Sequence, residues 1–114
     1  MIGRGEVWWA ELGEPRGAEP GYRRPLVIIQ TDSFNRSRIA TTIAVMLTSN
    51  LRLVEAPGNV LVRARESGLS QDSVANVSQL ATLDRAVLAE RVGRLPARVM
   101  ARLDNGLRLV LALG

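Results

Sequence analysis

The 114-residue chain contains neither cysteine nor histidine. Without cysteine it has no disulfide framework and no thiolate nucleophile. Without histidine it cannot build a Ser-His-Asp or Cys-His nucleophile system, nor a histidine pair for acid–base cleavage of RNA. These two residue types are also the usual zinc ligands, so we expect no zinc site. Any chemistry on phosphate would have to use arginine, hydroxyls, amides and carboxylates.

Lysine is missing as well, since all 15 basic residues are arginine and the net charge is +4. A genome rich in G and C would produce the same bias, so this absence alone indicates no function. The guanidinium is nevertheless a planar fork of donors that fits phosphate oxygens, and a basic chain favours an anionic partner. The acidic residues form no tight cluster and the glycines form no P-loop or dinucleotide motif, so we expect no metal and no cofactor.

Aromatic residues and long apolar runs are scarce. Only 4% of the residues are aromatic, although 46% are hydrophobic, so the core must consist of Val, Leu, Ile and Ala. No apolar run approaches the roughly 20 residues of a membrane-spanning helix, and the N-terminus lacks the pattern of a signal peptide. We therefore expect residues 1–114 to form one soluble, cytoplasmic domain with no membrane association.

The most informative stretch runs from Arg23 to Thr48. Pro25 holds Arg24 in an extended conformation at the entrance of an unbroken apolar run, 26–29, which is typical of a strand buried on both faces. A second strand of this kind, 41–47, follows a polar loop and ends at Thr48. If the two strands pair antiparallel, Thr48 falls near Arg24. A guanidinium and a hydroxyl at one end of a sheet would suit a phosphate site.

The remaining chain predicts short strands and one clear helix. After Pro96, apolar residues recur at three- and four-residue steps, which predicts a C-terminal helix whose stripe faces the core or a dimer partner. Asp84 or Thr82 can cap a helical turn over 85–88. The pattern favours a small α+β domain with a mostly antiparallel sheet. The further strands are expected at 5–12, 59–64, 70–77 and 90–95.

Several short motifs occur in a fixed order: R-P-x-x-x-I-Q-x-D from Arg24, then T-S-N from Thr48, D-S-V from Asp72 and Q-L-x-T-L-D from Gln79. Together they resemble the MazF/PemK family of toxin endoribonucleases, from Gly3 to the C-terminal helix. The resemblance implies a twisted, SH3-like partial barrel that acts as a homodimer. It also implies sequence-specific cleavage of single-stranded RNA (mRNA) without a metal, by attack of the ribose 2′-hydroxyl. The products would be 2′,3′-cyclic phosphate and 5′-hydroxyl ends, translation would be inhibited, and the partner would be an antitoxin with an acidic, partly disordered segment.

By the same resemblance, Arg24 and Thr48 are the expected catalytic pair. In the Gln79 motif, Ala81 stands where the family usually has arginine. Two other functions stay open: a non-catalytic SH3-like binding module, and a DNA-directed member of the family that poisons a topoisomerase. The candidate substrate-binding residues are Arg16, Arg23, Phe34, Asn35, Arg36, Ser49, Asn50, Asn76 and Gln79.

Overall fold

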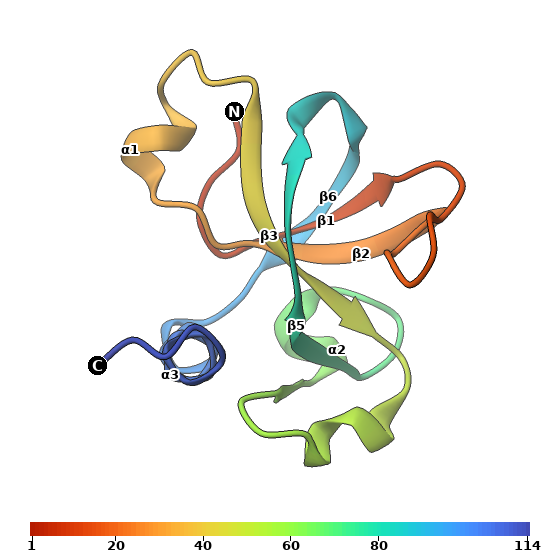
Figure 1. Cartoon of the computed structure of the whole chain (residues 1–114), viewed down its shortest axis with the longest axis vertical. Helices are drawn as coiled ribbons and strands as arrows, with labels where there is room; N and C mark the ends of the chain where they lie inside the picture. The colour runs from red at the N-terminus through yellow and green to blue at the C-terminus, as the bar shows by residue number, and fades with distance from the viewer.

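The computed structural model describes all residues, 1–114, as a six-stranded antiparallel sheet with three helices (Figure 1). The strand order is β4-β5-β3-β2-β1-β6. The strands are β1 (Glu6–Glu11), β2 (Arg23–Ile28), β3 (Thr41–Thr48), β4 (Val60–Val62), β5 (Ser73–Asp84) and β6 (Leu88–Arg94). The helices are α1 (Asp32–Asn35), α2 (Ala64–Ser67) and α3 (Ala97–Val110), with 3-10 turns η1 (Leu51–Glu55) and η2 (Arg85–Val87).

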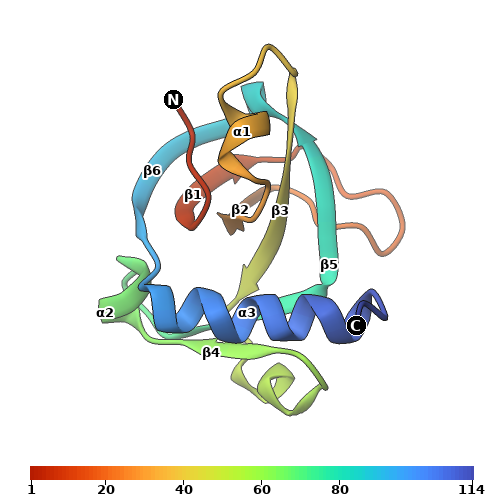
Figure 2. The same cartoon turned by 90° about the vertical axis from the view of Figure 1, so that its left-hand side faces the viewer.

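The sheet curls into a half-barrel, and α3 lies along one end of it beside β4 (Figure 2). This architecture confirms the predicted α+β class and the SH3-like partial barrel. None of the helices is both long and apolar enough to cross a membrane.

Two apolar clusters occupy the two faces of the sheet. Alternate residues of a strand point to opposite faces, so Leu26 and Ile28 pack in one cluster and Val27 in the other. This confirms that the apolar run after Pro25 is a strand buried on both faces. We call the cluster that includes α3 the helix-side core and the other the barrel-side core. The barrel-side core consists of Ala10, Leu26, Ile28, Ala44 and Met46.

The C-terminal helix begins after Pro96, as predicted. Val99, Met100, Leu103 and Leu107 are buried in the helix-side core, whereas the last residues of the apolar stripe, Val110 and Leu111, are exposed.

A glycine inside α3 has a packing reason. An added Cβ on Gly106 would lie 2.0 Å from the carbonyl oxygen of Gly58, so only glycine permits this close approach of two backbones. Gly58 itself has a φ of +87°, which forms the turn before β4.

Three local predictions differ from the structure. The strand expected at 70–77 begins at Ser73 and continues to Asp84, because 78–84 also pairs with β3. The polar loop expected between the two buried strands contains the four-residue helix α1, and a second four-residue helix, α2, follows β4. The predicted helical turn is a 3-10 turn, and the Asp84 carboxylate caps it by accepting a hydrogen bond from the backbone N–H of Ala86.

Candidate active site

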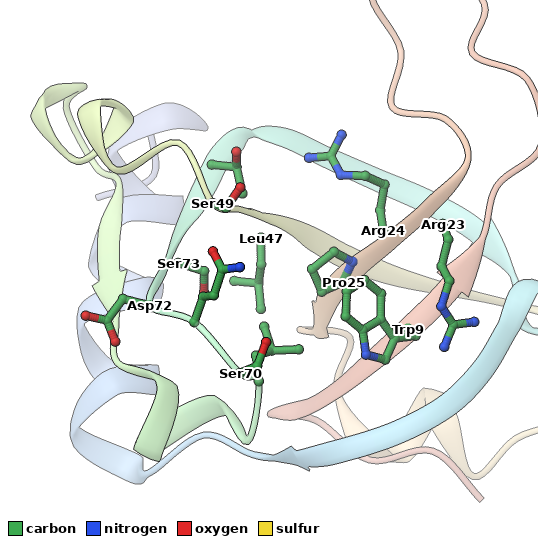
Figure 3. Close-up of a pocket in the computed structure, with 12 residues that line it drawn as sticks. Trp9, Arg23, Arg24, Pro25, Leu47, Ser49, Ser70, Asp72 and Ser73 are labelled. Carbon is green, nitrogen blue, oxygen red and sulfur yellow. The ribbon is translucent and has the colours of Figure 1, made fainter.

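The strand pairing brings Arg24 and Thr48 to the same end of the sheet. Leu26 of β2 pairs with Met46 of β3, and two residues further along each strand stand Arg24 and Thr48 on that same face. Both residues line a hollow of about 400 Å³, which we call the strand-end hollow (Figure 3). The predicted antiparallel pairing is therefore present. The other residues that line the strand-end hollow are Trp9, Arg23, Pro25, Leu47, Ser49, Leu69, Ser70, Gln71, Asp72 and Ser73.

The two arginines of the hollow have different partners. The Arg23 guanidinium donates to Glu11 at 2.6 Å and to Glu90 at 3.1 Å, and it lies 5.1 Å from the ring centre of Trp9. Arg24 is half-buried, and its side chain makes no hydrogen bond or ion pair. Figure 3 shows the two side chains projecting in different directions, with Arg23 beside Trp9. The donor fork of Arg24 is thus available to a bound anion.

The Thr48 hydroxyl is oriented by the turn that follows β3. Its Oγ1 accepts a hydrogen bond from the backbone N–H of Asn50 at 3.1 Å, which leaves the hydroxyl hydrogen free to donate. The Asn50 side chain in turn caps η1 by accepting from the N–H of Arg52. Arg24 of β2 and Thr48 of β3 thus each bring a side-chain donor to the strand-end hollow.

A single carboxylate lines the strand-end hollow, and it is already engaged. Asp72 accepts hydrogen bonds from the N–H of Ala64 at 2.8 Å and from Arg63 at 3.4 Å. Nowhere in the chain do three acidic side chains gather closely enough to hold a metal ion. The site offers guanidinium and hydroxyl donors, which fit a phosphate group.

A second, larger hollow of about 720 Å³ opens on the barrel side of the sheet, and we call it the β5 groove. Its walls include Met46 of β3 and residues 78–83 of β5, together with Arg16 from the loop between β1 and β2. Met46 and Thr48 lie two residues apart on β3 and point to the same face. Thr48 lines the strand-end hollow and Met46 lines the β5 groove, so the last three residues of β3 contribute to both.

The structure gathers part of the predicted substrate-binding set. Arg23 and Ser49 line the strand-end hollow, and Arg16 and Gln79 line the β5 groove. Asn50 borders the first hollow as the residue that orients Thr48.

Asn76 lies two residues before the part of β5 that lines the β5 groove. Its side-chain oxygen accepts hydrogen bonds from Ser78 at 2.9 Å and from Asn59 at 3.4 Å. Those bonds occupy the side-chain oxygen of Asn76, and its side-chain N–H groups have no hydrogen-bond partner within the protein.

The α1 region does not join either hollow. Phe34 and Arg36 are exposed, and neither lines the strand-end hollow or the β5 groove. Asn35 is only 1% exposed, and its amide is bonded to Gln30 and accepts from Thr42. Its prediction as a substrate ligand is corrected: the side chain is part of an internal polar network.

Several residues of the strand-end hollow were not predicted as site residues. They are Trp9, Pro25, Leu47, Leu69, Ser70, Gln71, Asp72 and Ser73. The D-S-V motif at Asp72 was the signal that could have found the last two. The others come from strands and a turn whose approach to Arg24 depends on the curl of the sheet.

Three carboxyl groups with lowered pKa values lie outside both hollows. At Glu6, burial raises the pKa, but hydrogen bonds from Trp8, Gly3 and Arg91 outweigh it. At Asp32, the N–H of Arg4 is the main cause of the lowered pKa. The Glu66 carboxylate accepts from the N–H of its helix N-cap residue, which lowers its pKa. These groups stabilise loops and helix ends.

Comparison with known families decides where the chain belongs. The profile of the PemK-like, MazF-like toxin of type II toxin–antitoxin systems matches residues 3–111. The chain belongs to this family.

Relatives within the PemK/MazF family align along the whole chain. Endoribonuclease MazF6 of Mycobacterium tuberculosis strain H37Rv is 48% identical over 99% of this chain and 99% of its own. Endoribonuclease EndoA of Bacillus subtilis strain 168 is 32% identical over 99% of this chain and 97% of its own. A mycobacterial endoribonuclease solved in complex with its cognate antitoxin superposes with a TM-score of 0.81 over 100% of this chain and 98% of its own, at 24% identity.

Proposed function

We propose that this PemK/MazF-family chain is an endoribonuclease toxin that cleaves single-stranded RNA at short sequences. The observation that carries the proposal is the pairing of Arg24, whose fork has no protein partner, with Thr48, whose hydroxyl hydrogen is free. Both line one hollow at the end of a rigid sheet. The proposal is supported by relatives named endoribonucleases at 48% and 32% identity.

In the proposed reaction, the ribose 2′-hydroxyl attacks the adjacent phosphorus. A 2′-oxygen–phosphorus bond forms and the bond from phosphorus to the 5′-oxygen breaks, which leaves a 2′,3′-cyclic phosphate and a 5′-hydroxyl. Arg24 holds two phosphate oxygens and stabilises the added charge of the transition state. Because a guanidinium stays protonated, Arg24 donates hydrogen bonds and does not act as the base. In this proposal the proton of the 2′-hydroxyl passes to solvent water, and the leaving 5′-oxygen takes a proton from solvent. Thr48 donates a hydrogen bond to a non-bridging oxygen.

Base selection belongs to the β5 groove in this proposal. Sequence-specific recognition of RNA uses unstacked bases that are hydrogen-bonded on their edges. Gln79 lines the groove, and its side chain makes no hydrogen bond within the protein. The neighbouring Ser49 and Asn50 can contact the nucleotide at the phosphate itself.

Two protein partners complete the proposal: a second copy of the chain and an antitoxin. A related mycobacterial endoribonuclease has been solved with its cognate antitoxin. An acidic, partly disordered antitoxin segment would be attracted to the arginines at Arg16, Arg23 and Arg24 and would cover both hollows. Reversing these three charges should weaken antitoxin binding, and unchanged affinity in a titration would argue against occupation of the hollows.

The direct test incubates the purified protein with defined single-stranded RNAs in excess EDTA. Cleavage at a preferred short sequence, with a 2′,3′-cyclic phosphate on the 5′ fragment, is the expected result. Cleavage that stops with EDTA and returns with Mg²⁺ would refute the mechanism. Inhibition of a topoisomerase without RNA cleavage would favour the DNA-directed function, and RNA binding without cleavage would favour a binding module.

A further inference from the structure

Strand β5 contains an unusually large bulge beside the proposed active site. Val45 of β3 pairs with Leu80, but the next residue, Met46, pairs with Asn76. One step along β3 therefore matches four steps along β5, which leaves residues 77–79 as a three-residue bulge. Bulges of this kind redirect side chains and are common next to active sites.

The bulge directs Val77 into the helix-side core, whereas Ser78 and Gln79 both line the β5 groove. Val77 is 2% exposed and packs in the helix-side core, which anchors the bulge from below. Ser78 is exposed, and Gln79 lines the β5 groove with an unengaged side chain. Met46, two residues before Thr48 on β3, lines the same groove as Gln79, so in the proposed function Gln79 is presented to a base of the RNA whose phosphate lies at Thr48.

Asn59, from the turn before β4, holds this bulge in place. Its Oδ1 accepts from the N–H of Val77 at 3.0 Å, a group that the bulge removes from the β ladder. Its Nδ2 donates to the backbone oxygen of Leu53 at 2.8 Å and to Asn76 Oδ1 at 3.4 Å. The same Asn76 oxygen accepts from the Ser78 hydroxyl at 2.9 Å. One side chain thus bonds the first residue of the bulge and the residue just before it.

Asn59 lies outside the RNA-facing hollows. It is half-buried and lines neither the strand-end hollow nor the β5 groove. Any effect of Asn59 on base selection must therefore pass through the bulge to Gln79.

We propose that Asn59 is a positioning residue for base selection: it fixes the 77–79 bulge and thereby aims Gln79 at the edge of an RNA base in the β5 groove. This inference rests on the proposed RNA cleavage and deepens it. It separates the residues proposed for cleavage from those proposed for base selection, because neither the Arg24 nor the Thr48 side chain hydrogen-bonds to Asn59.

The test measures base preference with single-turnover cleavage of an RNA pool that is randomised around the cleavage site. Asn59→Ala and Gln79→Ala should relax the preference at one and the same position, by about tenfold, the order expected for a lost base-edge hydrogen bond. The rate on the best substrate should fall much less than the preference does. The double variant should be no more relaxed than Gln79→Ala alone, since Asn59 acts through Gln79.

Two further variants serve as controls. Asn105→Ala, which removes an exposed amide of α3 bonded only to Arg108, should leave preference and rate unchanged. Because Asn59→Ala removes the partner of a buried N–H and can destabilise the domain, Asn76→Ala provides a milder perturbation of the same network that keeps the Val77 bond. It should relax the same position to a smaller extent.

The outcomes separate this inference from the proposed function. Folded Asn59→Ala and Asn76→Ala proteins with the wild-type base preference would overturn the positioning role. Relaxation that adds to that of Gln79→Ala, or that falls at another position, would show that Asn59 acts independently of Gln79 and would overturn it as well. A wild-type protein that cuts no RNA would instead overturn the proposed function on which the inference stands.

Discussion

Replacing Thr48 by valine tests the proposed chemistry with the smallest change to the fold. Valine has nearly the shape of threonine and the same β-branching, so the end of β3 should keep its conformation. The change removes two hydrogen bonds: the one that the hydroxyl accepts from Asn50, and the one that it would donate to the phosphate. Asn50 is exposed, so its N–H can bond water and the stability cost should stay near 1 kcal/mol or below.

The loss in rate should be much larger than the loss in stability. Removing one donor of the oxyanion-hole type costs roughly 10²–10³ in rate, equivalent to about 3–4 kcal/mol of transition-state stabilisation. Single-turnover cleavage of an RNA with one site should show this loss for Thr48→Val. Thr48→Ser keeps the hydroxyl and should retain most of the activity. A folded Thr48→Val protein that cuts RNA at the wild-type rate would refute the role of the hydroxyl.

Further variants test the arginine pair, the helix packing and the response to acid. Arg24→Lys keeps the charge but removes the planar donor fork, so it should impair single-turnover cleavage severely. Arg23→Ala should mainly reduce RNA affinity and the salt dependence of binding. Equal losses of cleavage rate in the two variants would contradict the assignment to Arg24. Gly106→Ala should lower the melting temperature by several degrees, because its Cβ would meet the Gly58 oxygen, and a wild-type melting curve would count against that contact. The lowered pKa of Asp32 stabilises the fold fully above about pH 4, and this contribution is lost as the pH falls through the folded-state pKa. Urea unfolding should therefore separate wild type from Asp32→Asn at pH 7, and the difference should shrink as the pH falls below about 4.

The proximity of Arg24 and Thr48 could be predicted because it depends on local rules. Pro25 marks the entrance of β2, the apolar run marks two buried faces, and an antiparallel pairing across a short connection brings Thr48 to Arg24. The family motifs gave the same pair independently. None of these steps required knowledge of contacts between distant segments.

The shape of β5 could not be predicted, because a bulge breaks the alternation that identifies a strand. Val77 points into one core, and after three residues without a partner the pairing resumes at Leu80. Read as a sequence, 78–84 therefore has no period of two. The burial of Asn35 was equally hidden, since its partners Gln30 and Thr42 come from β2's exit and β3.

A phosphate site must lie at the edge of this fold, because a guanidinium buried in the core would lose its hydration without a paired charge. Strand ends, however, fray unless they are held. Here the start of β2 is tied by Arg23 to Glu11 of β1 and Glu90 of β6, and the end of β3 is tied by the bond from Asn50 to Thr48. Exposed ion pairs add little to stability, so the consequence of these contacts is orientation. The neighbour of each of these two side chains is fixed to the protein, which leaves the Arg24 fork and the Thr48 hydroxyl hydrogen as the donors that the proposed function assigns to RNA.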